Sequence, residues 1–357
     1  MTWKTPEILL PVSFFGFAAL ANVSAVQNGE LTINSVADFM KGGVTAQIDD
    51  MYRENLPMRE YATGALGAAR FVLLNDGRKG VMVGNDGWLF SSEEVRSHTP
   101  DSVPAAETVG RMAEIIAEFQ DMGTRVVVVP LPAKIDIARE EAGVYELSDR
   151  RNAEYQEFLT LLTNADIPHV DTYAVFAELG PQAFYRTDTH WNTSATVAVA
   201  DLVAASGMIA AGSDAFEVET QPQEEFIGDL VNFVTNELFA DAAGFGMETV
   251  EPFVAIGGGA IDLFGNASEP STMLIGTSYS ANPRWSFVEA LKLSLQRDIL
   301  NLASEGQGPV VPMLDFVAEM ETAPELIIWE FPIRYLTDPE LWGDWAADNA
   351  QLASVQQ

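Results

Sequence analysis

The stretch RVVVVPLP, from Arg125 to Pro132, is an unbroken apolar run of the kind found in the central strands of parallel sheets. Strands buried on both faces carry continuous Val, Ile and Leu, whereas half-exposed strands alternate apolar and polar residues. Directly before it, apolar residues recur at helical spacing over 105–122 and stop at Gly123, a residue typical of helix ends. An amphipathic helix followed by a fully buried strand is therefore predicted.

The same alternation of helix and strand continues to the end of the chain. Helices are predicted around 155–162 and from Thr193 to Ser206, the latter with Asn192 or Thr193 as its N-cap. Repeated strand–helix–strand units predict an α/β fold, a three-layer α/β/α sandwich with a mostly parallel sheet. The remaining segments read as strand then short helix, strand, helix and strand: IPHVDTYAVF (167–176), TMLIG (272–276), SFVEALKLSLQRDI (286–299) and PELIIWEF (324–331).

The region before residue 105 shows a different pattern. Residues 35–70 place apolar and acidic residues at helical spacing, which predicts two or three helices broken near Gly42, Gly43 and Pro57. Three short strands are predicted next, because the turn signals NDGR and GNDG separate them. They are RFVLLN (70–75), GVMVG (80–84) and WLF (88–90).

Composition limits the possible partners. The 19 basic and 52 acidic residues give a net charge of −33, which excludes nucleic acid as a bulk partner and disfavours anionic lipid surfaces. Such a charge is typical of a solvated acidic surface, and an acidic metal cage is the alternative interpretation. The chain has no cysteine, so neither a disulfide framework nor a thiolate metal site is possible.

The N-terminus carries an export signal. Residues 8–29, ILLPVSFFGFAALANVSAVQNG, are uncharged and follow Lys4. About 20 apolar residues span the hydrocarbon core of a bilayer, but ALA and VSA also resemble the cleavage site of a signal peptide. We expect 1–30 to be a signal anchor or a cleaved signal peptide. The other predicted divisions are an N-terminal helical segment (31–69), the main domain (70–340) and a C-terminal tail (341–357).

A serine at the end of a predicted strand is the first candidate for chemistry. In STMLIGTSYSANPRWSF (271–287), Gly276 allows a tight turn after the strand, and Ser278 then precedes a helix. Open α/β sheets bind their ligands at this carboxyl edge. The arrangement resembles a nucleophile elbow, although Ser280 replaces the second glycine of G-x-S-x-G.

A histidine in FYRTDTHWN (184–192) is the matching candidate base. Imidazole exchanges protons near neutral pH, and Asp188, two residues before His190, can fix its tautomer. The alternative for His190 is a structural loop residue bonded to Asp188. His98 and His169 are assigned structural roles. For the Asp-x-His pair to act on Ser278, the two stretches must meet at one edge of the sheet.

The chain resembles the alginate O-acetyltransferase family of the AlgJ and AlgX type, a branch of the SGNH hydrolase superfamily. The resemblance covers roughly 70–336, and its most specific element is the Asp-x-His-Trp motif. Asp188 and His190 precede Ser278, which is the permuted order of this family. The matching segments are GNDGWLFSSEE, VVVVPLPAKIDIARE, YRTDTHWN, GTSYSANPRWSF and IIWEFPIRYL.

The resemblance implies an SGNH hydrolase-like fold and an acetyl transfer onto hydroxyls of an exported polysaccharide. Ser278 would be the nucleophile, His190 the base and Asp188 its orienting acid. It further implies an integral membrane acyltransferase partner that supplies acetyl groups, a periplasmic location and an inner-membrane anchor of the AlgJ type. The reaction is expected to need no metal and no soluble cofactor.

Oxyanion and substrate contacts are less clearly marked. The N–H of Tyr279 is the expected first oxyanion donor, with Gly228, Asn266 and Asn282 as candidates for the second. Four residues are candidates for substrate binding, each with a structural alternative, a core position for the first and salt bridges for the rest: Trp191, Arg186, Lys134 and Arg334.

Two other functions use the same residues. An acetyl esterase would have the same triad with water as the acceptor, and a polysaccharide-binding assembly subunit would have no catalysis at all. The net charge of −33 would also repel a polyuronate unless cations gather at the site. The candidates for such a gathering are Lys134, Arg186, Arg284 and Arg334, and a neutral exopolysaccharide is the alternative substrate.

Overall fold

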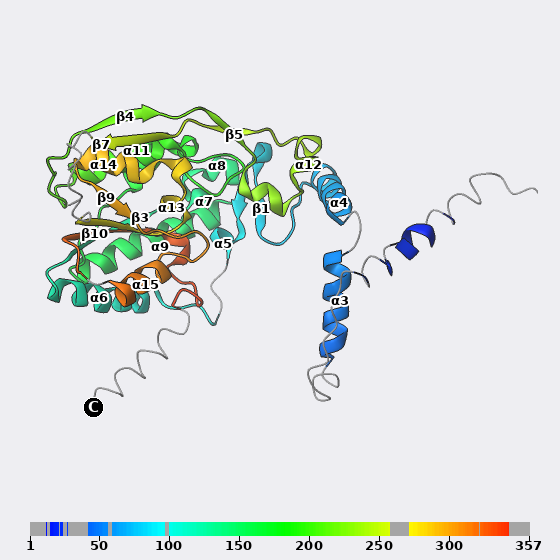
Figure 1. The fold of residues 1–357 in the computed structure, drawn as a ribbon, viewed down its shortest axis with the longest axis horizontal. Helices are drawn as coiled ribbons and strands as arrows, with labels where there is room; N and C mark the ends of the chain where they lie inside the picture. The colour runs from blue at the N-terminus through cyan, green and yellow to red at the C-terminus, as the bar shows by residue number, and fades with distance from the viewer. Residues whose placement is uncertain are drawn as a thin grey trace, which may run out of the picture.

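The computed structural model describes residues 12, 15–20, 22, 23, 27, 42–55, 59–96, 100–257, 271–320 and 322–342. Its centre is a parallel four-stranded sheet in the order β3–β10–β8–β9 (Figure 1). The last strand in sequence, β10, therefore lies inside the sheet, hydrogen-bonded to β3 on one side and β8 on the other. The strands are β3 (Arg125–Leu131), β8 (Thr272–Ile275), β9 (Ile299–Asn301) and β10 (Leu326–Pro332).

Helices cover both faces of the sheet (Figure 1). One face packs against α6 (Ala105–Asp121), α9 (Tyr145–Asn164) and α15 (Val311–Glu319). The other packs against α10 (Tyr173–Leu179), α11 (Thr193–Ala205) and α14 (Phe287–Leu295). The three-layer α/β/α sandwich with a parallel sheet is thus confirmed.

The valines of β3 show why the run RVVVVPLP has no polar residue. Successive side chains of a strand point to opposite faces. Val126 and Val128 belong to the core on the α6 side, whereas Val127 and Val129 belong to the core on the α11 side, and all four are fully buried. Each face therefore needs its own apolar residues.

Shorter elements surround this core. The strand predicted at the start of 167–176 is not formed as a regular strand. This segment contributes only an isolated parallel bridge between His169 and Val128. Two antiparallel ribbons, β4–β7 and β5–β6, lie in the excursion between α11 and β8. The strands of these ribbons are β4 (Phe216–Thr220), β5 (Glu224–Phe226), β6 (Glu248–Val250) and β7 (Phe253–Gly257). The short helices are α5 (Ser92–Val95), α7 (Lys134–Ile137), α8 (Arg139–Ala142), α12 (Glu237–Ala240), α13 (Ser278–Ala281), η2 (Gly180–Ala183), η3 (Asp229–Phe233), η4 (Asp241–Ala243), η5 (Pro283–Trp285) and η6 (Ile333–Tyr335).

The region before α6 differs in part from the prediction. The hairpin at GNDG is present, since β1 (Val81–Val83) and β2 (Leu89–Ser91) pair antiparallel around η1 (Asn85–Gly87). The predicted strand RFVLLN is wrong, because these residues end helix α4 (Arg59–Leu74). Helix α4 therefore crosses the predicted boundary at residue 70.

Packing explains the helical state of this apolar run. On α4, Gly64 and Gly67 come so close to η3 and the turn after it that an added Cβ would lie 2.4 Å from Asn236 or 2.2 Å from the carbonyl of Val234. A short apolar run does not by itself distinguish strand from helix. The outward side chains of α4 stay exposed, with Leu66 at 73% and Leu73 at 78%.

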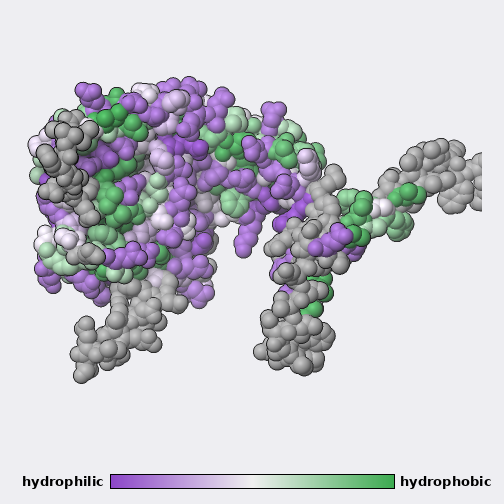
Figure 2. All heavy atoms as spheres, viewed as in Figure 1, coloured by the Kyte–Doolittle hydropathy of each residue, from purple (hydrophilic) through white to green (hydrophobic). Residues whose placement is uncertain are grey.

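Helix α3 (Gly43–Asn55) ends before Pro57 and α4 begins after it, and the predicted break at Pro57 itself lies outside the described residues. Most of the predicted export segment, 1–30, lies outside the described residues, and so does nearly all of the tail. Within the part of the chain that is described, no helix has both the length and the apolar character needed to cross a membrane. Hydrophilic residues spread over much of the face seen in Figure 2, in keeping with the 52 acidic residues.

Candidate active site

Ser278 stands where the sequence places it, at the carboxyl end of β8. The strand ends at Ile275, Gly276 and Thr277 form the turn, and Ser278 is the first residue of α13. The hydroxyl of Thr277 accepts a hydrogen bond from the N–H of Tyr279 at 3.3 Å and so caps the short helix. The serine is thus held on a tight strand-to-helix turn.

The structure brings Ser278, His190 and Asp188 together in one chain of hydrogen bonds. The Oγ of Ser278 lies 2.8 Å from Nε2 of His190, although the two residues are 88 positions apart. On the other side of the ring, Nδ1 lies 2.7 Å from Oδ1 of Asp188. The side chain of His190 is 12% exposed and that of Asp188 is 5% exposed. The predicted meeting of the two stretches is therefore observed.

A compact loop holds the acid and the histidine. Phe184 and Trp191 form an antiparallel bridge across it, and the N–H of Tyr185 donates to the carbonyl of His190. Inside the loop, Oδ1 of Asp188 also accepts the backbone N–H of His190 at 2.9 Å. The spacing Asp-x-His allows this second bond, which fixes the carboxylate relative to the imidazole.

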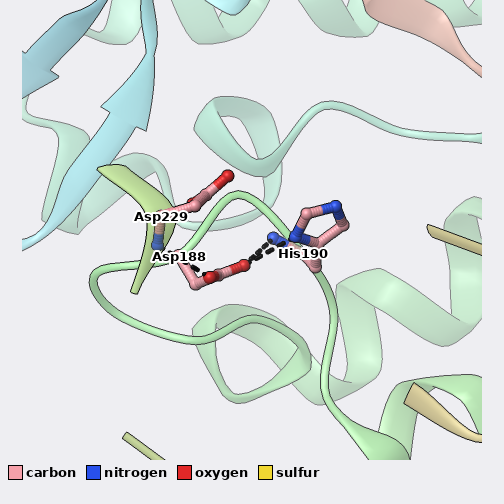
Figure 3. A group of neighbouring side chains, drawn as sticks. All are labelled: Asp188, His190 and Asp229. Carbon is pink, nitrogen blue, oxygen red and sulfur yellow. Dashed lines mark hydrogen bonds and ion pairs between the residues drawn. The ribbon is translucent and has the colours of Figure 1, made fainter. Parts of the chain in front are cut away.

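Asp229 completes the surroundings of the acid and was not singled out by the sequence. Its backbone N–H donates to Oδ2 of Asp188 at 2.9 Å, and its Oδ1 accepts the N–H of Thr189 at 2.7 Å. Figure 3 shows the Asp229 side chain beside Asp188 and His190. Both oxygens of Asp188 are therefore engaged, one by the His190 side and one by Asp229. In the sequence, Asp229 is marked only by its position next to Gly228, a candidate oxyanion donor.

The electrostatics keep the first acid ionised. Burial alone would raise the pKa of Asp188, but the hydrogen bond and charge of His190, together with the N–H groups of Asp229 and His190, bring that pKa below its ordinary value. Burial raises the pKa of Asp229, and the nearby charge of Asp188 raises it further. One ionised carboxylate at Asp188 is the state that orients an imidazole.

Among the described residues, Asp188, His190 and Asp229 form a group that could hold a metal ion, since one ligand atom from each lies within 4.8 Å of the others. These residues already have hydrogen-bond partners. His190 lies between Asp188 and Ser278, Asp188 also accepts the backbone N–H of Asp229, and the Asp229 carboxylate accepts the N–H of Thr189. The hydrogen-bonded chain that reaches Ser278 therefore runs through His190 and Asp188, and Asp229 supports it through its backbone.

The oxyanion candidates differ in their availability. The N–H of Tyr279 is engaged by Thr277, whereas the N–H groups of Ser278 and Gly228 form no hydrogen bond within the described part of the chain. The side-chain oxygen of Asn282 accepts from the N–H of Arg284, and Asn266 lies outside the described residues.

Trp191 does not offer a surface to a sugar. Its side chain is fully buried and stacks against Phe176, with 6.1 Å between ring centroids. Its Nε1 donates to the carbonyl of Tyr279 at 3.0 Å. The prediction of a substrate contact is corrected to a core position, because the aromatic face is covered by other rings.

Lys134 does not offer a substrate contact either. It is 1% exposed, and its ammonium donates to the carbonyls of Leu89, Arg186 and Asp188 at 2.7, 3.1 and 2.9 Å. Burial lowers its pKa to about 8, partly offset by the charge of Glu94. An ammonium has three hydrogens, so none is left for a ligand. Lys134 instead fastens the Asp188 loop to β2.

Arg334 has a similar structural role. The residue is 8% exposed, donates to the hydroxyls of Tyr279 and Tyr335, both at 3.2 Å, and pairs with Glu93 at 3.0 Å. Through its hydrogen bond to the Tyr279 hydroxyl, Arg334 supports the residue next to Ser278. The predicted substrate contact is corrected to a structural role, because the guanidinium is buried and is engaged by Tyr279, Tyr335 and Glu93.

Two arginines remain near the surface. Arg186 is exposed and its side chain has no partner among the described residues. Arg284 pairs with Glu224 at 3.1 Å and lies over the ring of Phe226. Of the four cations expected to gather at the site, two are buried and one is paired, so Arg186 alone keeps a free charge.

One aromatic contact of the base was missed. The ring of Trp285 stacks on the imidazole of His190, with 5.1 Å between centroids and 24° between planes. Trp285 is 2% exposed and follows Arg284 in the turn after α13. This tryptophan belongs to the matching segment GTSYSANPRWSF. Its contact with the base is not visible in the sequence, because nothing local connects it to a histidine 95 positions earlier.

Comparison with known proteins identifies the family of this chain. Residues 81–333 match the family described as SGNH hydrolase-like domain, acetyltransferase AlgX. The chain belongs to this family. It is 31% identical to the probable alginate O-acetylase AlgJ of Pseudomonas aeruginosa, over 83% of this chain and 81% of that protein.

Solved structures of the family share the fold. The O-acetyltransferase domain of Pseudomonas putida AlgJ superposes with a TM-score of 0.64 at 28% identity, and the match covers 76% of this chain and 98% of that one. AlgX of Pseudomonas aeruginosa superposes with a TM-score of 0.54 at 24% identity, over 71% of this chain and 62% of that one.

Proposed function

We propose that this protein is an O-acetyltransferase that moves an acetyl group through Ser278 onto hydroxyls of an exported polysaccharide, alginate or a related polymer. One observation carries the assignment of residues: Ser278, His190 and Asp188 form a continuous hydrogen-bonded chain at the carboxyl end of the sheet. The membership in an acetyltransferase family and the names of the AlgJ relatives give the group that is transferred and the class of acceptor.

In the first half-reaction Ser278 takes the acetyl group. Its Oγ attacks the acetyl carbonyl carbon of the donor while Nε2 of His190 accepts the hydroxyl proton. When the tetrahedral intermediate collapses, the bond to the leaving group breaks and the leaving group takes the proton from His190. The product is an acetyl ester on Ser278 and a free donor group. Asp188 stabilises the imidazolium and keeps Nδ1 protonated throughout.

In the second half-reaction a sugar hydroxyl receives the acetyl group. Nε2 of His190 accepts the proton of that hydroxyl as its oxygen attacks the ester carbonyl. Collapse of the second intermediate breaks the bond to Ser278, and His190 returns the proton to Oγ. Splitting the transfer into two steps suits a donor and an acceptor that never meet directly.

The oxyanion formed in both steps needs N–H donors. We assign this role to the backbone of Ser278 and Gly228, since neither N–H has an acceptor within the described residues and Gly228 is buried. Buried N–H groups are rarely left unpaired, so a ligand oxygen is a reasonable partner. Tyr279, the donor expected from the sequence, would first have to release Thr277.

The donor and the location follow from the same proposal. A protein exported by its N-terminal segment has no access to cytoplasmic acetyl carriers, so an integral membrane acyltransferase would supply acetyl groups on the periplasmic side. The segment 1–30 would hold the protein at the inner membrane or be cleaved after export.

The test is an acetyl transfer assay with oligosaccharides, an acetyl donor and mass spectrometry of the products. The wild-type protein should add mass to the sugar, and Ser278→Ala should abolish the addition while leaving the thermal unfolding midpoint unchanged. Release of acetate without any acetylated sugar would identify an esterase instead. Transfer that persists in Ser278→Ala would remove the serine from the mechanism.

A further inference from the structure

Glu330 is a fully buried carboxylate beside the nucleophile turn. It lies on β10 directly after Trp329, whose register partner is Ile275 at the end of β8. The side chain therefore reaches across from the neighbouring strand to the turn that begins at Gly276. None of the steps proposed above uses this residue.

Within the described residues, all side-chain hydrogen bonds of Glu330 go to the turn that carries Ser278. Its carboxylate accepts the backbone N–H of Thr277 at 2.7 Å and the Thr277 hydroxyl at 3.0 Å. It also accepts the hydroxyl of Ser280 at 3.1 Å. These donors come from the residue before Ser278 and from the second residue after it, so the carboxylate holds the serine from both sides.

The glycine of the turn makes room for this contact. A Cβ added to Gly276 would lie 2.4 Å from Oε2 of Glu330 and 2.8 Å from its Cβ. Real side chains do not approach so closely, so the carboxylate occupies the place that a larger residue at 276 would need. The small residue of the turn and the acid on the next strand therefore require each other.

The cost of this arrangement indicates a purpose. Among the described residues no Lys, Arg or His forms an ion pair with Glu330. Burial raises its pKa to about 6, against the opposing effects of the Thr277 and Ser280 hydrogen bonds and of the charge of Arg334, which is not in contact with it. A buried carboxylate without a contacting cation is expensive, and an apolar residue would pack there at lower cost.

We infer that Glu330 is a positioning residue, which fixes the Gly276–Ser280 turn so that Oγ of Ser278 faces His190. The inference rests on the proposed function, because it assumes that Ser278 is the nucleophile. Loss of the carboxylate would free Thr277 and Ser280 to rotate and would let the serine hydroxyl move from the imidazole. Displacements of about 1 Å at a reacting group cost about 100-fold in rate.

The test measures the reactivity of Ser278 directly, with phenylmethylsulfonyl fluoride as the probe. Attack by Oγ forms the sulfonyl ester and releases fluoride, with the proton taken by His190, and intact-protein mass spectrometry follows the rate. Glu330→Met, which removes both acceptor oxygens, should react about 100-fold more slowly than the wild type, with an acetyl transfer kcat reduced in proportion and an unchanged KM. Circular dichroism and the thermal midpoint show whether the variant is folded.

A matched control separates positioning from stability. Glu154 is another buried carboxylate, paired with Arg151 on α9, so Glu154→Met should lower the thermal midpoint without slowing sulfonylation of the folded protein. If Glu330→Met does not fold, the pair Thr277→Val and Thr277→Ser replaces it. The valine removes the hydroxyl that donates to Glu330 and should slow the reaction, whereas the serine keeps that hydroxyl and should restore it.

The outcomes are distinct. A folded Glu330→Met that reacts at the wild-type rate overturns the inference and leaves the function of Ser278 intact. Equal rates for Thr277→Val and Thr277→Ser overturn it as well. A wild-type protein that gives no adduct on Ser278 overturns the proposed nucleophile, and the role of Glu330 is then lost with it.

Discussion

The hydroxyl of Tyr279 donates to the carbonyl of Thr189 at 2.8 Å, across 90 positions of sequence. In the opposite direction, Nε1 of Trp191 donates to the carbonyl of Tyr279 at 3.0 Å. Thr189 and Trp191 flank His190 in the chain, and Tyr279 directly follows Ser278, so both bonds join the neighbours of the reacting pair. The loop that carries the base and the turn that carries the serine are therefore joined independently of the reacting groups.

Removing the Tyr279 hydroxyl should loosen this connection. Tyr279→Phe loses its bonds to Thr189 and Arg334 and leaves a buried carbonyl unpaired, at a cost of about 1–3 kcal/mol. We expect that loss of stability in urea unfolding, together with a several-fold lower acetyl transfer rate. Tyr145→Phe is the control, since Tyr145 is 55% exposed. Equal stability of the two variants would show that the connection contributes nothing.

The sequence predicted the elements of the fold whose signals are local. Helices on both faces follow from the run of valines in β3, and the turn after β8 follows from an apolar strand that ends at Gly276. The pair Asp188 and His190 could be assigned because the two residues share one loop. Their meeting with Ser278 required the permuted order of a known family, since no local pattern connects residues 88 positions apart.

The errors concern residues whose surroundings come from distant segments. Lys134 is left open between a substrate contact and a structural salt bridge by the sequence, because the three carbonyls that its ammonium binds are 45 to 54 positions away. Trp191 was left open between core and surface, and its stacking with Phe176 decides for the core. Glu330 gave no signal at all, because an acid inside the apolar strand LIIWEF matters only through the strand beside it.

The two acids beside His190 should differ sharply in their effect. Asp188→Asn removes the charge that holds the imidazole tautomer, so the acetyl transfer kcat should fall about 10³- to 10⁴-fold. Asp229→Asn keeps the backbone N–H that supports Asp188 and keeps an oxygen for Thr189, so less than about a 10-fold loss is expected. Single-turnover kinetics with both variants measure the difference. Comparable losses would mean that Asp229 shares the role assigned to Asp188.

The titration of Glu330 should appear in the pH dependence of stability. Its pKa is about 6 in the folded protein and about 4.5 when unfolded, so the folded state binds the proton more tightly. The stabilisation is therefore complete below about pH 4.5 and is lost as the pH rises through about 6. It amounts to about 2 kcal/mol.

The variant Glu330→Gln cannot titrate, so it isolates this contribution. The free energy of unfolding of the wild type, relative to that of Glu330→Gln, should increase by about 2 kcal/mol between pH 7 and pH 4.5. Urea unfolding of both proteins across this range measures it, and groups common to both cancel. A constant difference would mean that Glu330 has the same pKa in the folded and unfolded states.

Arg186 tests which polymer the site accepts. It is the exposed cation two positions before Asp188, and the other three expected cations are buried or paired. If the acceptor is a polyuronate, Arg186→Ala should raise KM for the oligomer several-fold at low salt and leave kcat unchanged, because the charge attracts but does not react. The effect should shrink as salt screens the charge.

Arg125→Ala is the matched control, since this exposed arginine begins β3 at the opposite end of the strand from the Ser278 edge. The same pair of variants should behave alike with a neutral oligosaccharide. An unchanged KM for Arg186→Ala with the charged oligomer would remove Arg186 from the acceptor site and would favour a neutral exopolysaccharide as the natural substrate.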